Sequence, residues 1–271
     1  MTPVELRHRL HTGPAVFGTL IVSPSPAWPA AVKDCGLDFV FIDTEHIALD
    51  RVQLSWMCQT YAGLGLPPLV RIPSPDPYAA TVALDGGAAG VIAPYVETLE
   101  EAQAMRGAVK LRPIKGGKLR QMLSGQGAEP ELEAYVEERA QNRILILNIE
   151  SVPAMQALDA ILTVPGLDAV LIGPHDLSCS LGVPERYDHP GFLTACETIF
   201  RKARAAGVGA GIHYWGDASE QARFLAMGAN MLIHSADISL FKKHLTAELK
   251  AVKKAAGLGG VADSAKVSIN I

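Results

Sequence analysis

The 271-residue sequence contains little cysteine and no paired cysteine motif. Its four cysteines are scattered singly along the chain, at Cys35, Cys58, Cys179 and Cys196. Without a C-x-x-C pair, neither a disulfide framework nor a zinc knuckle is expected. Scattered cysteines that stay reduced and mostly buried are typical of the cytosol, so the sequence predicts a cytoplasmic protein.

Long apolar runs and an excess of positive charge are also missing. The longest apolar runs, such as residues 39–42, have the length of a β-strand, so no membrane-spanning segment is expected. The first ten residues lack the apolar region of a signal peptide. The chain carries 24 Lys and Arg residues against 28 Asp and Glu residues, a net charge of −4, and has no basic tract. This balance argues against nucleic acid as a partner.

The sequence does contain a regular alternation of short β-rich runs and longer amphipathic stretches. Most of the eight predicted strands are almost continuously apolar, as expected for parallel strands that are covered on both faces. They are Ala15–Val22, Phe39–Asp43, Leu69–Ile72, Gly90–Pro94, Ile144–Glu150, Ala169–Gly173, Val208–His213 and Met231–His234. The predicted helices are Trp28–Cys35, Leu49–Leu64, Pro77–Leu84, Leu99–Val109, Val152–Leu162, Phe192–Ala206, Ala218–Met227 and Ile238–Ala256.

Eight strand–helix units in a chain of this length predict an α/β fold of the (β/α)8 TIM barrel type. We expect one barrel over residues 1–257, followed by a small, weakly ordered tail at 258–271. A doubly wound sheet is the alternative, but no G-x-G-x-x-G motif follows the first strand. The long connection 110–142, with a helical pattern only at Pro130–Ala140, is expected to be a functional lid or an oligomer contact.

Two further absences restrict the reaction classes and substrates that the sequence supports. No lysine lies in a predicted strand or at its carboxyl end, so the Schiff-base chemistry that requires a desolvated lysine is not expected. No glycine-rich phosphate-binding segment follows the seventh or eighth strand, which disfavours a sugar phosphate as substrate. Metal-assisted chemistry on a small carboxylate is the reaction class that remains.

Acidic residues follow two neighbouring strands, Glu150 after the fifth and Asp176 after the sixth. Two carboxylates that converge on one pocket, with water and substrate completing the coordination, are a usual site for Mg²⁺, Mn²⁺ or a similar ion. The alternative is that each carboxylate caps the helix that follows it.

The second and third strands also end in ionisable residues. His46 follows Asp43 by three residues, a spacing at which the carboxylate would orient the imidazole as a base. The alternative is a loop histidine packed beneath a helix start. Arg71 needs an anion, either Glu45 or a substrate carboxylate or carbonyl oxygen, and these two roles are compatible.

As a set, these residues resemble the HpcH/HpaI aldolase family, the metal-dependent class II pyruvate aldolases. The resemblance covers roughly residues 15–240. It rests on five stretches in matching order and spacing: Ile42–His46, Leu69–Arg71, Leu84–Ala88, Ile149–Met155 and Ile172–Ser178.

The resemblance implies a barrel that exchanges its C-terminal helix between subunits and assembles as a hexamer, a trimer of dimers. It also implies that Glu150 and Asp176 bind a divalent cation (Mg²⁺, Mn²⁺ or Co²⁺) that chelates pyruvate. Arg71 would contact the substrate and stabilise the enolate. His46, oriented by Asp43 or Asp85, would relay protons to and from the aldol hydroxyl. The remaining substrate contacts would come from Asn148, Gly173, Pro174, His175 and His213.

Three departures from the family pattern concern the aldehyde. Asn148 stands where glutamine is common, Lys118 stands where the P-x-x-G-x-R-G loop has arginine, and His213 begins a bulky stretch where small or aliphatic residues are common. The residues assigned to the metal and the enolate match the pattern.

The leading hypothesis is therefore a lyase that reversibly cleaves a 4-hydroxy-2-oxo acid to pyruvate and an aldehyde. A rival is a citrate-lyase-β-like or citrate-synthase-like enzyme that acts on a CoA thioester or oxaloacetate. In that case the basic segment Lys115–Arg120 would contact a polyanion, although a solvated charged loop is the favoured explanation of that segment. A non-catalytic binding or assembly barrel is a third hypothesis, disfavoured because such a barrel has no use for the complete set of polar strand ends.

Overall fold

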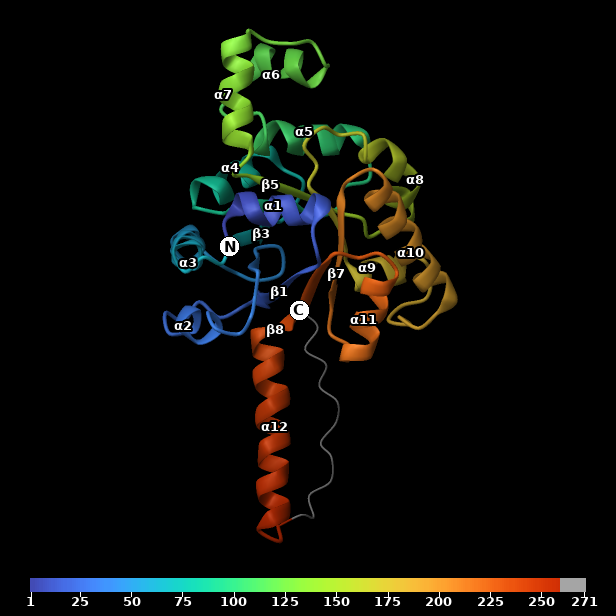
Figure 1. The fold of residues 1–271 in the computed structure, drawn as a ribbon. Helices are drawn as coiled ribbons and strands as arrows, with labels where there is room; N and C mark the ends of the chain where they lie inside the picture. The colour runs from blue at the N-terminus through green and yellow to red at the C-terminus, as the bar shows by residue number, and fades with distance from the viewer. Residues whose placement is uncertain (259–271) are drawn as a thin grey trace.

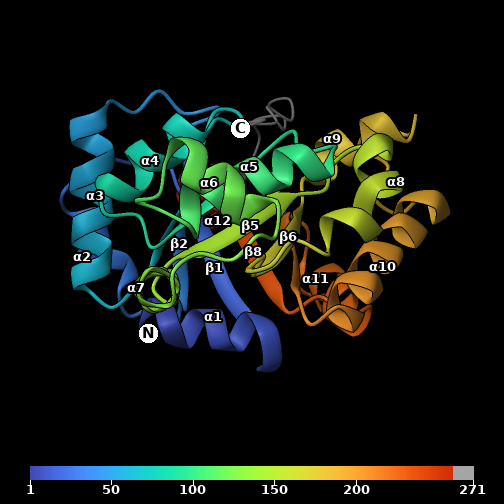
Figure 2. The same cartoon turned by 90° about the horizontal axis from the view of Figure 1, so that it is seen from above.

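The computed structural model describes residues 1–258 and shows a closed barrel of eight parallel strands surrounded by helices (Figures 1 and 2). Neighbouring strands in the chain are neighbours in the barrel, and β1 closes it against β8. The strands are β1 (Val16–Ile21), β2 (Phe39–Asp43), β3 (Pro68–Arg71), β4 (Gly90–Ala93), β5 (Ile144–Asn148), β6 (Ala169–Ile172), β7 (Gly209–Tyr214) and β8 (Met231–Ala236). This topology confirms the predicted TIM barrel and excludes the doubly wound alternative.

The helices include those that periodicity predicted and three that it did not. They are α1 (Pro3–Thr12), α2 (Trp28–Val32), α3 (Arg51–Gly63), α4 (Pro77–Asp85), α5 (Leu99–Val109), α6 (Gly116–Leu123), α7 (Pro130–Ala140), α8 (Val152–Ile161), α9 (Pro174–Ser180), α10 (Pro190–Ala205), α11 (Ala218–Ala226) and α12 (Asp237–Ala255). The unpredicted helices are α1, α6 and α9. Helix α1 begins with a capping box between Thr2 and Glu5, and only Leu6 and Leu10 are buried in it. Such a polar helix is signalled by its cap rather than by an apolar stripe.

The apolar core has two parts, one inside the barrel and one between the strands and the surrounding helices. Leu6 and Leu10 of α1 belong to the inner part, where they pack with the first residues of several strands. Because strands begin at this end, α1 covers the amino end of the barrel. The carboxyl end is left to the loops that connect strands to helices.

A buried ionic cluster fixes α1 to the amino end. Asp168, which immediately precedes β6 and is fully buried, accepts hydrogen bonds from Arg7 Nε at 2.7 Å and from Lys110 Nζ at 2.5 Å. His11 Nε2 lies 3.0 Å from the same carboxylate, and the Leu145 amide donates to it at 2.8 Å. Burial alone would raise the pKa of Asp168, but these partners outweigh burial and lower it. The cluster stabilises the closed amino end.

The long connection between α5 and β5 folds into α6 and α7 and lies at the amino end as well. It leaves the end of α5 and returns to the first residue of β5, so both of its attachments are at that end. In Figure 1 it projects from the side of the barrel opposite α12, which follows β8. The Lys118 ammonium of α6 pairs with the carboxylate of Glu129, the residue before α7, at 2.9 Å.

Helix α12 projects from the carboxyl end, away from the barrel (Figure 1). Its first residue, Asp237, is buried and accepts hydrogen bonds from the amides of Val22 and Ser23. Beyond this anchor the helix is exposed and carries an apolar stripe at helical spacing, which we call the α12 stripe: Ile238, Phe241, Leu245, Leu249 and Val252. Of the helices within residues 1–258, none is long and apolar enough to cross a membrane. The expected tail lies outside the described residues apart from Leu258.

Candidate active site

Four strand ends bring most of the predicted site residues together. Asp43 ends β2, Arg71 ends β3 and Asn148 ends β5, while Gly173 directly follows β6. Because all strands run in parallel, these residues lie at the carboxyl end of the barrel. Asp43 and Arg71 are also paired in register across β2 and β3. The site is thus built from neighbouring strands.

The Arg71 guanidinium lies between two carboxylates. Its Nε and Nη2 atoms donate to the two oxygens of Asp43 at 2.9 and 2.6 Å. The same Nε lies 3.0 Å from Glu45 Oε2, which is the ion pair considered from the sequence. Burial opposes the charge, but the two carboxylates outweigh it and raise the pKa of Arg71. In the same way, Arg71 overcomes the effect of burial and lowers the pKa of Asp43. Arg71 is therefore a fixed, permanently charged cation.

His46 meets a different carboxylate from the one predicted. Both oxygens of Asp43 are engaged by Arg71, and His46 Nε2 lies 3.5 Å from Glu45 Oε1. The carboxylate in contact with the His46 ring is therefore that of Glu45, and orientation of the imidazole by Asp43 stays a prediction. Glu45 and His46 are adjacent in the chain, so the spacing from Asp43 to His46 did not indicate this contact. The His46 side chain is 45% exposed and is open to solvent at the mouth of the site.

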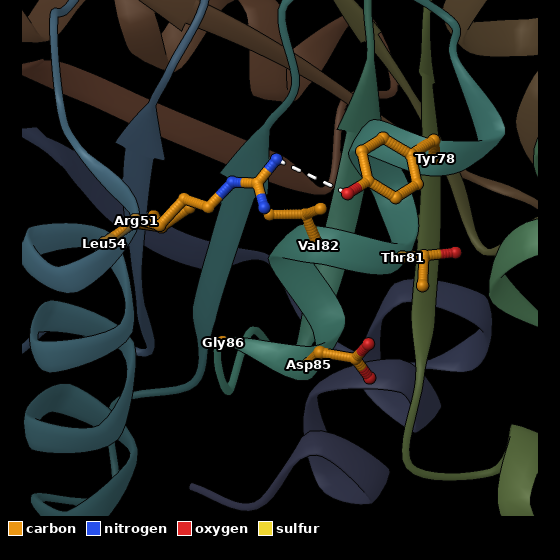
Figure 3. Close-up of a pocket in the computed structure, with 7 residues that line it drawn as sticks. All are labelled: Arg51, Leu54, Tyr78, Thr81, Val82, Asp85 and Gly86. Carbon is orange, nitrogen blue, oxygen red and sulfur yellow. Dashed lines mark hydrogen bonds between the residues drawn. The ribbon is translucent and has the colours of Figure 1, made fainter.

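Asp85, the other predicted partner of His46, lies at the opposite end of the barrel. It is the last residue of α4, a helix that runs from the end of β3 back to the start of β4. Its carboxylate pairs with Arg112. Figure 3 shows Asp85 with Arg51 and Tyr78 around a cavity of ≈ 300 Å³ between α3 and α4. Asp85 therefore cannot orient His46 within one chain, because the length of α4 separates them.

The basic segment Lys115–Arg120 is likewise distant from the strand ends that carry Glu150 and Asp176. It spans the start of α6, which belongs to the connection at the amino end. Lys118 is also paired with Glu129 within that connection. Within one chain this segment does not reach the site, so the structure gives no support for a polyanion contact there.

The Glu150 and Asp176 carboxylates converge, as predicted from their strands. A Cβ atom built on Gly173 would lie 2.7 Å from Glu150 Oε2 and 3.3 Å from Asp176 Oδ2, so only glycine leaves room for both carboxylates. Glu150 accepts hydrogen bonds from the Tyr95 amide at 3.0 Å and from Asn148 Nδ2 at 2.8 Å. Burial first, and then the charge of Asp176, raise the pKa of Glu150 to about 7 against these hydrogen bonds. The two carboxylates therefore repel each other when both are ionised.

The chemistry of this pair fits a divalent cation. Carboxylate oxygens suit hard ions such as Mg²⁺ and Mn²⁺, which keep several coordination positions for water or substrate. Asn148 Oδ1, beside Glu150, is buried and has no hydrogen-bond partner, which adds another oxygen that needs a donor or a cation. Within residues 1–258 no group of three or more His, Cys, Asp or Glu side chains is arranged to hold a metal. A cation here would therefore take two ligands from the chain and the others from water or substrate.

His213 is enclosed inside the barrel. Its Nε2 lies 2.9 Å from the Ser235 carbonyl oxygen, an acceptor, so this nitrogen carries the proton. The ring contacts Phe41 edge-on and lies 4.4 Å from the Trp215 ring, centre to centre. Burial lowers the pKa of His213 to about 4, so the imidazole is neutral at physiological pH. Phe41 contacts both this ring and the Arg71 guanidinium.

The start of α9 carries the other predicted substrate contacts. Pro174 is its buried first residue, and His175 is about half exposed. His175 Nδ1 lies 3.7 Å from Glu185 Oε1, and Nε2 lies 3.9 Å from Cys179 Sγ. The structure thus places the His175 ring against two residues that the sequence analysis did not associate with it.

A cavity of ≈ 230 Å³ adjoins the carboxylate pair and contains residues that the sequence analysis missed. It is lined by Tyr95, Val96, Glu97, Glu150, Ser151, Asp176, Cys179 and Ser180. The loop after β4 contributes Tyr95, Val96 and Glu97. The end of β4 carries Ala93 and Pro94 rather than an ionisable residue, so the sequence did not single out this loop. Following every strand into its loop would have found Tyr95.

Comparison with known proteins identifies relatives of the whole barrel. The model of the HpcH/HpaI aldolase/citrate lyase family matches residues 20–243. A pyruvate aldolase of Rhizobium etli is 31% identical over 241 residues, which covers 88% of this chain and 93% of that protein. A 2-keto-3-deoxy-L-rhamnonate aldolase of Klebsiella pneumoniae is also 31% identical, over 89% of this chain and 90% of that protein.

A solved structure shares the fold over nearly the whole length. The crystal structure of an HpcH/HpaI aldolase from Desulfitobacterium hafniense has a TM-score of 0.79 and 29% sequence identity. The match covers 92% of this chain and 96% of that chain.

Proposed function

The chain belongs to the HpcH/HpaI aldolase/citrate lyase family of carbon–carbon lyases, and from this premise we propose that it is a metal-dependent pyruvate aldolase. Its substrate would be a 4-hydroxy-2-oxo acid, cleaved reversibly to pyruvate and an aldehyde. In the cleavage direction the C4 hydroxyl loses its proton and the C3–C4 bond breaks. The electron pair of that bond passes to the pyruvate half as an enolate, which then takes a proton at C3. The observation that supports this best is the convergence of Glu150 and Asp176 beside Gly173.

Glu150 and Asp176 would hold the divalent cation, Mg²⁺, Mn²⁺ or Co²⁺. When bound, such an ion supplies Lewis-acid polarisation of the 2-oxo group and helps to position the substrate. Asn148 holds Glu150 in place through its amide nitrogen, and its buried amide oxygen has no hydrogen-bond partner. Glycine at 173 keeps that space open.

Arg71 would stabilise the enolate. Its guanidinium is held by Asp43 and Glu45, so it is already oriented before substrate binds and needs no rearrangement during the reaction. A preorganised positive charge at the developing oxyanion is the most effective kind of electrostatic stabilisation. The amides that follow Pro174 at the start of α9 would contact the substrate carboxylate, as the family resemblance implies.

His46 would accept the proton of the C4 hydroxyl. Its imidazole is partly exposed, and Glu45 Oε1 lies 3.5 Å from Nε2. Glu45 thus contacts both Arg71 and His46 and couples the enolate half of the site to the proton-transfer half.

The direct test is release of pyruvate from a panel of 4-hydroxy-2-oxo acids. Activity is measured as purified, after EDTA treatment, and after addition of Mg²⁺, Mn²⁺ or Co²⁺. We expect EDTA to abolish turnover and at least one ion to restore it. Turnover that persists after complete metal removal would contradict the metal-dependent mechanism, and silence with every acid and every ion would contradict the aldolase assignment.

The α12 stripe supports a proposal about assembly. A projecting helix with exposed apolar residues at helical spacing has a face that is typically covered by another surface. We propose that a second copy of the chain covers it, with α12 exchanged between subunits in a hexamer built as a trimer of dimers. Leu245→Glu should yield a smaller particle by light scattering, whereas Lys253→Glu, on the same helix but outside the stripe, should not.

A further inference from the structure

Tyr95 has a backbone conformation that its side chain does not favour. Its φ angle is 55°, in the left-handed region that suits glycine and is unfavourable for a bulky residue. Pro94 and Val96 on either side are buried, and the Tyr95 amide donates to Glu150 Oε1. The backbone is thus held by its neighbours and by the carboxylate pair, and the ring is directed outward from this fixed point.

Stability of the fold does not account for a tyrosine at this position. The side chain is 54% exposed, so the ring contributes little to the core. Glycine would relieve the backbone strain and retain the amide that binds Glu150. What tyrosine adds at this position is therefore its ring and its hydroxyl.

The ring and hydroxyl of Tyr95 lie between the two halves of the site. Tyr95 lines the ≈ 230 Å³ cavity together with Glu150 and Asp176. The hydroxyl hydrogen-bonds Glu45, and this bond, with burial and the nearby negative charges, raises the pKa of Tyr95 to about 12. Tyr95 therefore contacts Glu45, the neighbour of His46, and also lines the cavity beside the carboxylate pair.

The cavity beyond Tyr95 has negative charge and hydroxyl groups. Three carboxylates line it, those of Glu97, Glu150 and Asp176, and none of its described lining residues is Lys, Arg or His. A cation held by Glu150 and Asp176 would compensate those two, which leaves Glu97 uncompensated. Ser151 donates to Glu97 at 2.5 Å and contributes a second polar group to the same wall.

The start of α8 does not supply an anion site to offset this charge. The Ala154 amide is bound by Ser151 Oγ at 3.2 Å, and the Val152 amide is bound by Ser180 Oγ at 3.0 Å. Since these two amides are already engaged, they are not available for a carboxylate at the far end of a substrate.

We propose that Tyr95 and Glu97 form the wall that selects the aldehyde half of the substrate, admitting neutral, hydroxylated aldehydes and disfavouring those that end in a carboxylate. The Tyr95 ring limits the width of the aldehyde, and the Glu97 charge repels a terminal anion. This proposal rests on the proposed aldolase function and specifies its substrate class.

The experiment compares two substrates of equal length. One is 4,5-dihydroxy-2-oxopentanoate, which releases glycolaldehyde, and the other is 4-hydroxy-2-oxoglutarate, which releases glyoxylate. We expect kcat/KM to favour the neutral-ended substrate by about tenfold, a factor typical of one charge at a partly solvated site. Glu97→Gln should reduce that ratio several-fold, and Glu97→Lys should invert it. Glu100→Gln, an exposed carboxylate outside the cavity, is the matched control and should leave the ratio unchanged.

The role of Tyr95 is tested with aldehydes that differ in width rather than in charge. Tyr95→Ala should raise kcat/KM for branched aldehydes relative to glycolaldehyde, and Tyr78→Ala, an exposed tyrosine on α4, should not. Tyr95→Gly should not lower the midpoint of thermal unfolding, because it relieves the left-handed strain. A substantial loss of stability would instead show that the ring serves the fold, and would overturn its assignment to the wall.

A separate measurement distinguishes failure of the wall from failure of the aldolase assignment. Exchange of the pyruvate C3 hydrogens with deuterium, followed by NMR in the metal-supplemented wild-type protein, requires enolisation but no aldehyde. If exchange occurs but neither Glu97→Lys nor Tyr95→Ala changes selectivity, the wall is wrong and the aldolase function stands. If exchange and cleavage are both absent, the aldolase assignment fails and the wall fails with it.

Discussion

The two ends of the barrel differ in whether their buried carboxylates are paired with protein groups. At the amino end, the fully buried Asp168 is satisfied by Arg7, Lys110, His11 and a backbone amide. At the carboxyl end, Arg71 is paired with Asp43 and Glu45. Glu150 and Asp176, however, repel each other there, and the buried Asn148 Oδ1 has no hydrogen-bond partner. The amino end thus satisfies its buried carboxylate with protein partners, whereas the carboxyl end keeps one carboxylate pair and one amide oxygen available for a ligand.

Backbone strain follows the same division. Within residues 1–258, the non-glycine residues with positive φ are Tyr95, Glu185 and Ser235. Tyr95 follows the end of β4, Ser235 lies near the end of β8, and Glu185 is in the loop after α9 that also contacts His175. These are all elements of the carboxyl half. Strain and unpaired groups that reduce stability are concentrated where ligands bind, a division of roles that TIM barrels share.

The sharpest test of this comparison is Glu150→Gln. We expect kcat to fall by about 10³-fold or more, because the chain would lose one of its two charged ligands for the cation and the Lewis-acid contribution is several kcal/mol. Unfolding should show equal or higher stability, because the repulsion with Asp176 is removed. A variant that keeps full activity would contradict the assignment of Glu150 as a metal ligand.

At the amino end, Asp168→Asn should have the reverse effect. Removing this carboxylate leaves the buried Lys110 without its counter-charge, and loss of one partner of a buried pair typically destabilises by roughly 3–5 kcal/mol. Denaturant unfolding measures this loss. At a temperature where the variant remains folded, kcat should match the wild type; a large loss of activity there would mean that the two ends are coupled.

His213 predicts how stability depends on pH. Its pKa is about 4 in the folded protein, against 6.5 for an unperturbed histidine, so the unfolded chain binds the extra proton first as pH falls. Stability should be full above pH 6.5 and decline as pH falls toward 4, by about 3 kcal/mol in all from this group. Denaturant unfolding at several pH values tests this. In His213→Gln the decline in this interval should be much smaller, and an unchanged pH profile would rule out His213 as its source.

A smaller effect is expected for Arg71→Lys, which keeps the charge but loses the paired contact with Asp43. Lysine cannot reproduce the planar fork of the guanidinium. We expect kcat to fall by about 10²-fold, in the range seen when one electrostatic stabiliser is lost. Steady-state kinetics with one 4-hydroxy-2-oxo acid measure this. An increase in KM with unchanged kcat would show that Arg71 contributes binding alone.

Much of the site was predictable because strand ends are readable in the sequence. Asp43, Arg71, Asn148 and Gly173 were placed at the carboxyl end from apolar runs that stop at polar residues, and the structure puts them there. Tyr95 was not found, because β4 ends in Ala93 and is followed by Pro94, so the functional side chain comes only in the loop beyond the strand end.

By itself the sequence determined the barrel, its strand order and the approach of Glu150 to Asp176, because these follow from the spacing of apolar residues along the chain. Only the tertiary structure decided which charges pair. Asp43 binds Arg71 through the register of β2 and β3, Glu45 rather than Asp43 meets His46, and the length of α4 carries Asp85 to the other end. Local periodicity indicates which residues are buried. The pairing of charged side chains depends instead on strand register and on the direction of helices, which bring together segments that are far apart in the chain.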